Sequence, residues 1–338
     1  MHQPADHIMT SPAKRAAQRF RRMLDTDKAI IAAHFALARR ETDPSRATFY
    51  AARGYAMQTC YRTTRIVVHE PDDDAPYTTM HTARQCRSRT CQVCQRIHAR
   101  QTRRLHHALL ERIWRHTPEM RISLLTLSMR NRPLAEAKPA LEDFTGAVRR
   151  YYALKEVKRS HHGVLIGVEA AIRGDDANPM IGWHAHCAQL ITDACMVEGR
   201  YLAIMRIREL FRDCLRVDYL PQCWIAASKP DPDGDTRQPD RNSTTEAVKY
   251  CCKPVSYLSA NPPKDLFGAA DAPRFHVSPD VVRYLTEALH NRQLVTMKGA
   301  WAKARKEHCA EQRTAKRNRR SPSSPDPFQS DEFDGLPF

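Results

Sequence analysis

Gly182-Trp-His-Ala-His-Cys187 is the stretch of this chain that most constrains its fold and its chemistry. Apolar segments flank it, Gly163-Val-Leu-Ile-Gly-Val-Glu169 before and Ala188-Gln-Leu-Ile191 after. Because side chains alternate between the two faces of a β-strand, His184 and His186 are expected to point to one face. Two neutral imidazoles on one face make half of a divalent-metal site. The alternative is a pair of ordinary strand histidines beside solvent.

The composition favours a nucleic-acid partner. The chain has 338 residues, and 54 Lys and Arg against 38 Asp and Glu give a net charge of +16. Such an excess favours a polyanion, although some basic proteins have no such role. No run of about 18 apolar residues predicts a membrane span, and residues 1–22 lack the apolar core of a secretion signal. The 11 unevenly spaced cysteines suit a metal site in a reducing cytoplasm better than a disulfide framework.

The hydrophobic pattern predicts an α+β fold. Helices are expected over residues 11–42, 97–116, 134–159, 199–216 and 278–292, with a short one from Thr244. Strands are expected over residues 120–129, 163–172, 181–191 and 222–227, and residues 55–96 look irregular. Strands separated by long helices are typical of a central, mostly antiparallel sheet flanked by helices.

A cysteine cluster precedes the first strand. Three cysteines are spaced as Cys86-x4-Cys91-x2-Cys94, and a tetrahedral zinc site needs four ligands. Cys60 is the best candidate for the fourth, with His81 and His98 as rivals. Surrounding arginines would give such a zinc module a basic surface: Arg87, Arg89, Arg96, Arg100, Arg103 and Arg104. The alternative is a set of free thiols.

Downstream, Glu246-Ala-Val-Lys-Tyr250-Cys-Cys-Lys253 combines an acid, a tyrosine and a lysine. Offsets of four and seven share one helical face, so the three side chains would project together. Positive charge from Lys249 or Lys253 would help ionise the tyrosine, and Glu246 could act as a general base. The alternative is an ordinary amphipathic helix carrying a partly buried tyrosine.

Glu169 ends an otherwise apolar strand. If residues 163–172 pair with 181–191 as a hairpin, one register puts Glu169 beside His184 and His186. A carboxylate with two imidazoles suits Mg²⁺ or Mn²⁺ in phosphoryl transfer better than a closed structural zinc site. Such an ion would polarise a scissile phosphate.

Taken in order, these motifs resemble the plasmid rolling-circle replication initiators. These belong to the HUH endonuclease superfamily, in the branch whose single tyrosine is preceded by a glutamate. The resemblance covers about residues 60–257 and includes Leu125-Thr-Leu127 as the first strand motif. Ala185 and Cys187 depart from the usual proline and aromatic residue, and Cys91-Gln-Val-Cys94 lacks the usual proline.

The resemblance implies roles for individual residues. His184 and His186 look like the metal ligands, with Glu169 as a possible third. Tyr250 is similar to the nucleophile, with Tyr257 next in line, and Lys253 to the lysine that follows it. Glu246 resembles the glutamate that activates water in the terminating step. The four cysteines of the family pattern correspond to Cys60, Cys86, Cys91 and Cys94.

The implied activity is metal-dependent nicking and strand transfer at a plasmid origin, presented as single-stranded or hairpin DNA. A phosphotyrosine intermediate would leave a 3′-OH primer, and a second cleavage would terminate replication in a bacterial cytoplasm. The expected regions are a basic helical region (1–54), a cysteine-rich zinc module (55–100), an HUH domain (101–295) and a disordered tail, first basic and then acidic (296–338).

Residues 321–338 carry no Lys or Arg and are of low complexity, which predicts disorder. They end in the acidic stretch Asp331-Glu-Phe-Asp-Gly-Leu-Pro-Phe338. It resembles the tip of bacterial single-stranded-DNA-binding proteins and implies docking to a host helicase or other replication factor. An acidic tail without a specific partner is the alternative.

Two other functions fit part of the pattern. A conjugative relaxase or single-strand transposase of the HUH type would use the same histidines and tyrosine. The cysteine cluster and Glu246 favour the initiator. A non-catalytic zinc-containing DNA-binding regulator would explain the charge and cysteines but leave the other motifs as coincidence.

Overall fold

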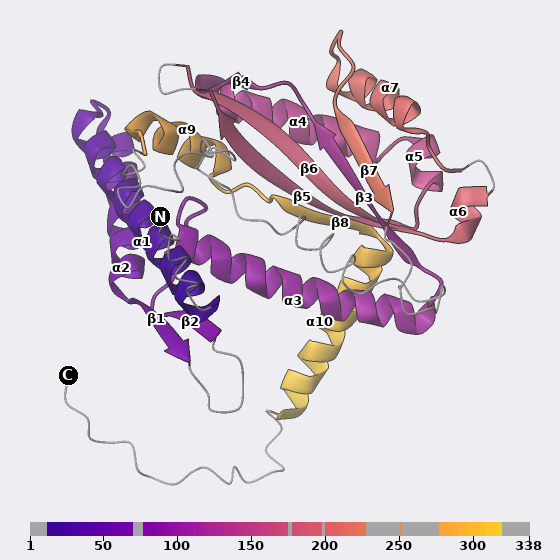
Figure 1. Ribbon diagram of the computed structural model, residues 1–338, viewed down its shortest axis with the longest axis horizontal. Coiled ribbons are helices and arrows are strands. Elements are labelled where there is room, and N and C mark those ends of the chain that lie inside the picture. The colour runs from indigo at the N-terminus through magenta and orange to yellow at the C-terminus, as the bar shows by residue number, and fades with distance from the viewer. Residues whose placement is uncertain are drawn as a thin grey trace, which may run out of the picture.

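A six-stranded antiparallel sheet forms the centre of the computed structural model, which describes residues 12–69, 77–174, 178–197, 200–227, 251 and 277–319 (Figure 1). The strand order is β7-β3-β6-β5-β8, and short β4 pairs with the start of β6. The strands are β3 (Arg121–Ser128), β4 (Arg132–Pro133), β5 (Gly163–Arg173), β6 (Met180–Ile191), β7 (Cys223–Ala227) and β8 (Val295–Gly299). The predicted α+β class with a mostly antiparallel sheet is confirmed.

β5 and β6 form the hairpin expected from their apolar sequences. Glu169 faces His184 across the ladder, and Gly167 faces His186. On the other side of β6, Ser128 of β3 faces His184. All but the last three residues of β5 are buried, because helices cover much of both faces of the sheet.

Helices α4 (Ala137–Tyr151), α7 (Ile204–Leu215) and α9 (Pro279–Leu289) contribute to the core on one face of the sheet. The sheet residues in this core include Leu125, Leu127, Ala185 and Cys187. Since side chains alternate along a strand, these are the positions between the ones that carry the histidines.

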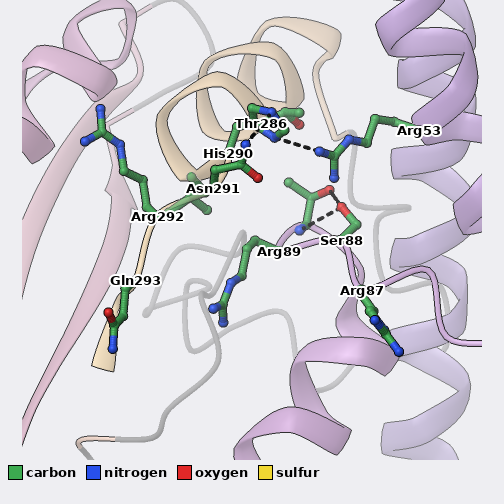
Figure 2. A pocket seen from close by; sticks show the side chains of 11 residues that line it. Arg53, Arg87, Ser88, Arg89, Thr286, His290, Asn291, Arg292 and Gln293 are labelled. Atoms are coloured by element: carbon green, nitrogen blue, oxygen red, sulfur yellow. Dashed lines mark hydrogen bonds between the residues drawn. The ribbon is translucent and has the colours of Figure 1, made fainter. Parts of the chain in front are cut away.

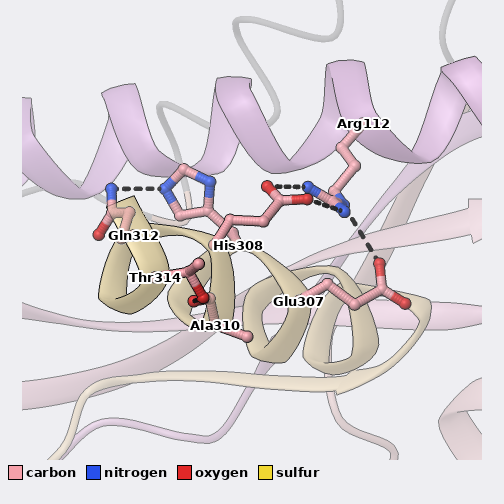
Figure 3. Close-up of polar contacts among 7 residues, drawn as sticks. Arg112, Glu307, His308, Ala310, Gln312 and Thr314 are labelled. Carbon is pink, nitrogen blue, oxygen red and sulfur yellow. Dashed lines mark hydrogen bonds and ion pairs between the residues drawn. The ribbon is translucent and has the colours of Figure 1, made fainter. Parts of the chain in front are cut away.

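The opposite face is covered only in part, by α3 (Gln92–His116) and α10 (Ala300–Arg319). Their buried Leu109, Leu110 and Trp301 pack with Leu165 of β5 and Ala188 of β6. Figure 1 shows the two helices crossing beside β8. Arg112 links them by ion pairs to Glu307 and Glu311 (Figure 3). These pairs are largely exposed, so burial of Trp301 is the stronger contact.

The N-terminal part consists of α1 (Pro12–Arg40), α2 (Pro44–Arg62) and the hairpin of β1 (Thr64–His69) with β2 (Tyr77–Thr82). The interpretation of residues 55–96 as irregular is therefore wrong over much of its length. Asp43 caps α2 by accepting a hydrogen bond from the Ser45 amide at 2.8 Å, and Pro44 stands at its first position.

Two further expectations need correction. The segment 296–338 was expected to be a disordered tail, but residues 295–299 form β8, which pairs with β5, and α10 follows. Trp301 and Ala304 bury this otherwise basic helix against the core. The helix expected over 134–159 is instead a 3-10 turn (Leu134–Glu136), α4 and α5 (Lys155–Arg159), because Leu154 is extended.

Two expected features lie outside the described residues: the helix from Thr244 and the tail beyond Arg320. The predicted helix over 199–216 is represented by α7, preceded by short α6 (Asp193–Val197). Among the helices that the structure describes, none combines the length and apolar character needed to cross a bilayer.

Acid should destabilise the fold through two buried histidines. Burial lowers the pKa of His34 and of His106 to about 4. Between pH 6.5 and 4 the unfolded chain therefore binds protons that the folded chain does not, and stability present above pH 6.5 is lost as the pH falls. The loss is on the order of 2 kcal/mol per histidine. Urea unfolding at pH 7.0, 5.5 and 4.5 measures it.

His106→Phe keeps a ring beside Trp301 and should flatten this pH dependence, whereas His116→Gln, at an exposed position, should not. An unchanged slope in His106→Phe would contradict the assignment.

Candidate functional site

The end of this sheet face beyond α3 and α10 carries the polar residues of the candidate site. Thr126 and Ser128 of β3 face His186 and His184 of β6, and Glu169 of β5 faces His184 from the other side. Directly opposed residues share a face, so all five side chains lie together. The register expected for Glu169 is present.

Hydrogen bonds orient both imidazoles. Nδ1 of His184 lies 2.8 Å from Oγ of Ser128, and Nδ1 of His186 lies 3.2 Å from Oγ1 of Thr126. When each Nδ1–H donates to its hydroxyl, Nε2 is the ring nitrogen that carries the lone pair, as a metal ligand requires. Nε2 of His186 is 3.1 Å from Oε2 of Glu169.

Glu169 is only 8% exposed, and a buried carboxylate is costly without a partner. Nε2 of His186 is one such partner. A carboxylate and imidazoles are suitable ligands for a divalent cation, although these atoms and those of His184 are less tightly gathered than the cysteine sulfurs described below.

Gly167 allows a second segment to approach the site. A Cβ at this position would collide with the backbone carbonyl of Cys251. The Cys251 thiol is buried and donates to the carbonyl oxygen of His186 at 3.1 Å. Residue 251 thus packs on the strand that carries the histidines. Glu246, Tyr250 and Lys253 themselves lie outside the described residues.

Two adjoining hollows of about 500 and 430 Å³ run beside the histidines. They share Ser128, Arg208 and Gln222, with His184 lining one and Trp224 the other. Trp224 is 57% exposed on edge strand β7, opposite Thr126. This joined hollow is called the Trp224 cleft below. An exposed indole next to an arginine offers a flat apolar surface and a positive charge.

Arg130 forms another wall of the Trp224 cleft. Its guanidinium lies 4.0 Å from the centre of the Tyr219 ring, and its amide donates to the Tyr219 hydroxyl at 3.1 Å. Sequence analysis did not single out Trp224, Arg130 or Arg208. The short strand over 222–227 was predicted, but its pattern alone does not tell which face is left uncovered.

The four predicted cysteines come together. Sγ of Cys60 lies 3.9 Å from that of Cys91 and 3.6 Å from that of Cys94, and Cys86 lies 3.5 Å from Cys94. All four are free thiols, and they can hold one metal ion. Within the described part of the chain, Cys60 and not His81 or His98 completes the group.

Short elements bring these sulfurs to one point. Cys60 belongs to the last turns of α2, Cys86 to the loop after β2, and Cys91 caps α3, on whose first turn Cys94 lies. Hydrogen bonds within the group, from Cys86 first, lower the pKa of Cys60, while those on Cys91 raise its pKa. The pKa of Cys94 is lowered as well and that of Cys86 is raised, so the thiols of Cys60 and Cys94 ionise more readily than those of Cys86 and Cys91.

Asp27 of α1 supports this cluster and was missed. Its carboxylate accepts from the amides of Gln92 and Val93 at 2.7 and 3.2 Å, and lies 3.4 Å from Sγ of Cys91. Burial raises the pKa of Asp27 to about 6, while the hydrogen bonds from these two amides act in the opposite direction and lower it. Nothing in the sequence distinguishes Asp27 from its neighbour Asp25.

One of three comparisons with known proteins identifies a family. The family model described as "Replication protein" matches residues 77–327, about three quarters of the chain. Neither a search of curated proteins nor one of solved structures gave a match. The matched region contains the sheet, the candidate histidine site and three of the four clustered cysteines.

Proposed function

We propose, from the premise that this chain belongs to the replication protein family and is a plasmid replication initiator, that it nicks one origin strand by the HUH mechanism. The observation that carries the proposal is the pair of oriented histidines with buried Glu169 at the open end of the sheet, against which residue 251 packs. Initiators of this family are nicking endonucleases.

His184, His186 and Glu169 are the proposed holders of a catalytic Mg²⁺ or Mn²⁺. Their chemistry fits because hydroxyls occupy the Nδ1 atoms, so that Nε2 of each ring can face an ion beside the Glu169 carboxylate. When bound, the ion would polarise the scissile phosphate and stabilise charge that develops on it.

Tyr250 is the proposed nucleophile. Its phenolic oxygen would form a bond to the phosphorus while the bond from phosphorus to the 3′ oxygen breaks, which leaves a 5′-phosphotyrosine and a free 3′-OH. Lys253 would favour the ionised tyrosine, and Glu246 would activate water for the terminating cleavage. Support comes from Cys251, the next residue in the sequence, whose thiol contacts the His186 backbone.

The Trp224 cleft is the proposed path of the single strand. Bases stack on exposed aromatic rings whatever their sequence, and arginines attract the backbone. Arg130 and Arg208 supply that charge beside His184.

Zinc is the proposed ion of the cysteine cluster. Zn–S bonds of about 2.3 Å in a tetrahedron separate the sulfurs by about 3.8 Å, close to the 3.5–3.9 Å observed. We also expect the protein to act in the bacterial cytoplasm. Recruitment of a host helicase or replication factor by the end at Pro337 and Phe338 stays a prediction.

Tyr250→Phe should abolish covalent capture of a labelled origin oligonucleotide and leave its binding intact, because only the attacking oxygen is removed. Denaturing gels measure the adduct, and a filter assay measures binding. Tyr257→Phe is the control that should still form it. Chelation should stop wild-type nicking, and added Mg²⁺ or Mn²⁺ should restore it. An adduct that persists in Tyr250→Phe would place the nucleophile elsewhere.

Trp224→Ala should weaken single-strand binding by about 5- to 150-fold, the equivalent of roughly 1–3 kcal/mol for one lost stacking contact. Trp224→Phe should recover most of it. Tyr201→Ala removes another exposed aromatic, which does not line the cleft, and should have little effect. Equal losses in Trp224→Ala and Tyr201→Ala would argue against the cleft as the path.

Purified protein should carry about one zinc ion per chain, measured by elemental analysis. Cys86→Ser should lose it and lower the unfolding temperature, because one of four ligands is gone. Cys309→Ser on α10 is the matched control with zinc retained. A zinc content unaffected by Cys86→Ser would refute the site.

A further inference from the structure

A basic pocket of about 350 Å³ lies between the cysteine module and the end of α9, away from the Trp224 cleft (Figure 2). Arg53 of α2, the loop Arg87–Thr90 and residues 286–293 line it. Four arginines are among its lining residues and no carboxylate is: Arg53, Arg87, Arg89 and Arg292. This set of side chains favours an anion.

Two of the arginines are held at the pocket. Nη2 of Arg53 lies 2.6 Å from Nδ1 of His290, and in Figure 2 the side chain of Arg89 extends between the Ser88 loop and Gln293. Arg292 instead points away and pairs with Glu142. The last carbonyls of α9 contribute a partial charge of only about −0.5, so the two full positive charges dominate.

Thr286 indicates a ligand in this pocket independently of the arginines. It is only 4% exposed, it lines the pocket, and its Oγ1 has no hydrogen-bond partner among the residues that the structure describes. Buried polar atoms in folded proteins are nearly always bonded, so an unpartnered hydroxyl at a pocket wall indicates a group that completes it. Hydroxyls of Ser88 and Thr90, 2.8 Å apart, line the same space.

The pocket wall continues into the catalytic sheet. Leu294 follows Gln293, and its carbonyl oxygen accepts from the amide of Val168 at 2.8 Å, one residue before Glu169. Through Leu294, the pocket wall at Gln293 is thus connected directly to the strand residue next to Glu169. The pocket is also much larger than one phosphate, which leaves room for a polymer to enter and leave.

We propose that this pocket binds a backbone phosphate of the DNA strand that is cleaved, and so fixes that strand relative to Glu169 and His186. The proposal rests on the proposed nicking function for the identity of the strand. The binding of a phosphate by arginines and hydroxyls in this pocket does not depend on the nicking function.

The first test uses inorganic phosphate and the whole protein. Phosphate should raise the unfolding temperature of the wild type, and Thr286→Val and Arg89→Gln should each reduce the apparent phosphate affinity at least five-fold. Arg62→Gln, an exposed arginine of α2, removes the same charge and should not. Thr286→Val retains shape and removes an unsatisfied hydroxyl, so it should fold at least as stably as the wild type. A phosphate response equal in all four proteins would overturn the proposal.

The second test distinguishes DNA from a free nucleotide. With an origin oligonucleotide, both pocket variants should raise the KM for covalent capture about five- to ten-fold with kcat unchanged, and Arg89→Gln should reduce the salt slope of binding by about one. If a nucleoside triphosphate binds through these residues while the KM for DNA is unchanged, the DNA assignment is overturned. If the wild type forms no adduct on any oligonucleotide, the nicking function fails, and the phosphate titration still decides the pocket.

Discussion

The pairing register of β6 with β3 and β5 is the constraint on which the rest of the structure depends. It aligns Ser128, His184 and Glu169 across three strands on one face. A slip of one residue would turn both histidines into the core formed with α4 and α7 and bring Ala185 to the open face. The apolar residues that flank and separate the histidines fix the register, because Trp183, Ala185 and Cys187 are fully buried.

Helices α3 and α10 pack on only part of the sheet face that carries the candidate site. Leu165 and Ala188 are packed under α3 and α10, whereas His186 and Glu169, further along the same face, are not. Gly167 stands at the transition, and the backbone of Cys251 occupies the space that a side chain would fill. One glycine therefore lets a second segment approach the two histidines without displacing the strand.

Much of this could be predicted because it depends on short-range patterns. Short apolar stretches separated by a polar turn identified β5 and β6, and close spacing identified three of the clustered cysteines. Other elements are stabilised by contacts far apart in sequence. The segment that forms α10 has the composition of a basic tail, and burial of Trp301 against α3 is what stabilises it as a packed helix. Arg53 and His290 meet across 237 residues, and no local pattern reports such a contact.

Helix α3 connects the cysteine cluster to the central sheet. Its first turn carries Cys94 and is held by Asp27, while Leu109 and Leu110 near its other end pack under the central sheet. Its 25 residues span about 38 Å as a continuous helix. Because a helix of packed side chains transmits displacement rather than absorbing it, the position of the cysteine cluster is coupled to that of the sheet. The contacts of the cysteine cluster that fix the start of α3 therefore also influence the position of the central sheet.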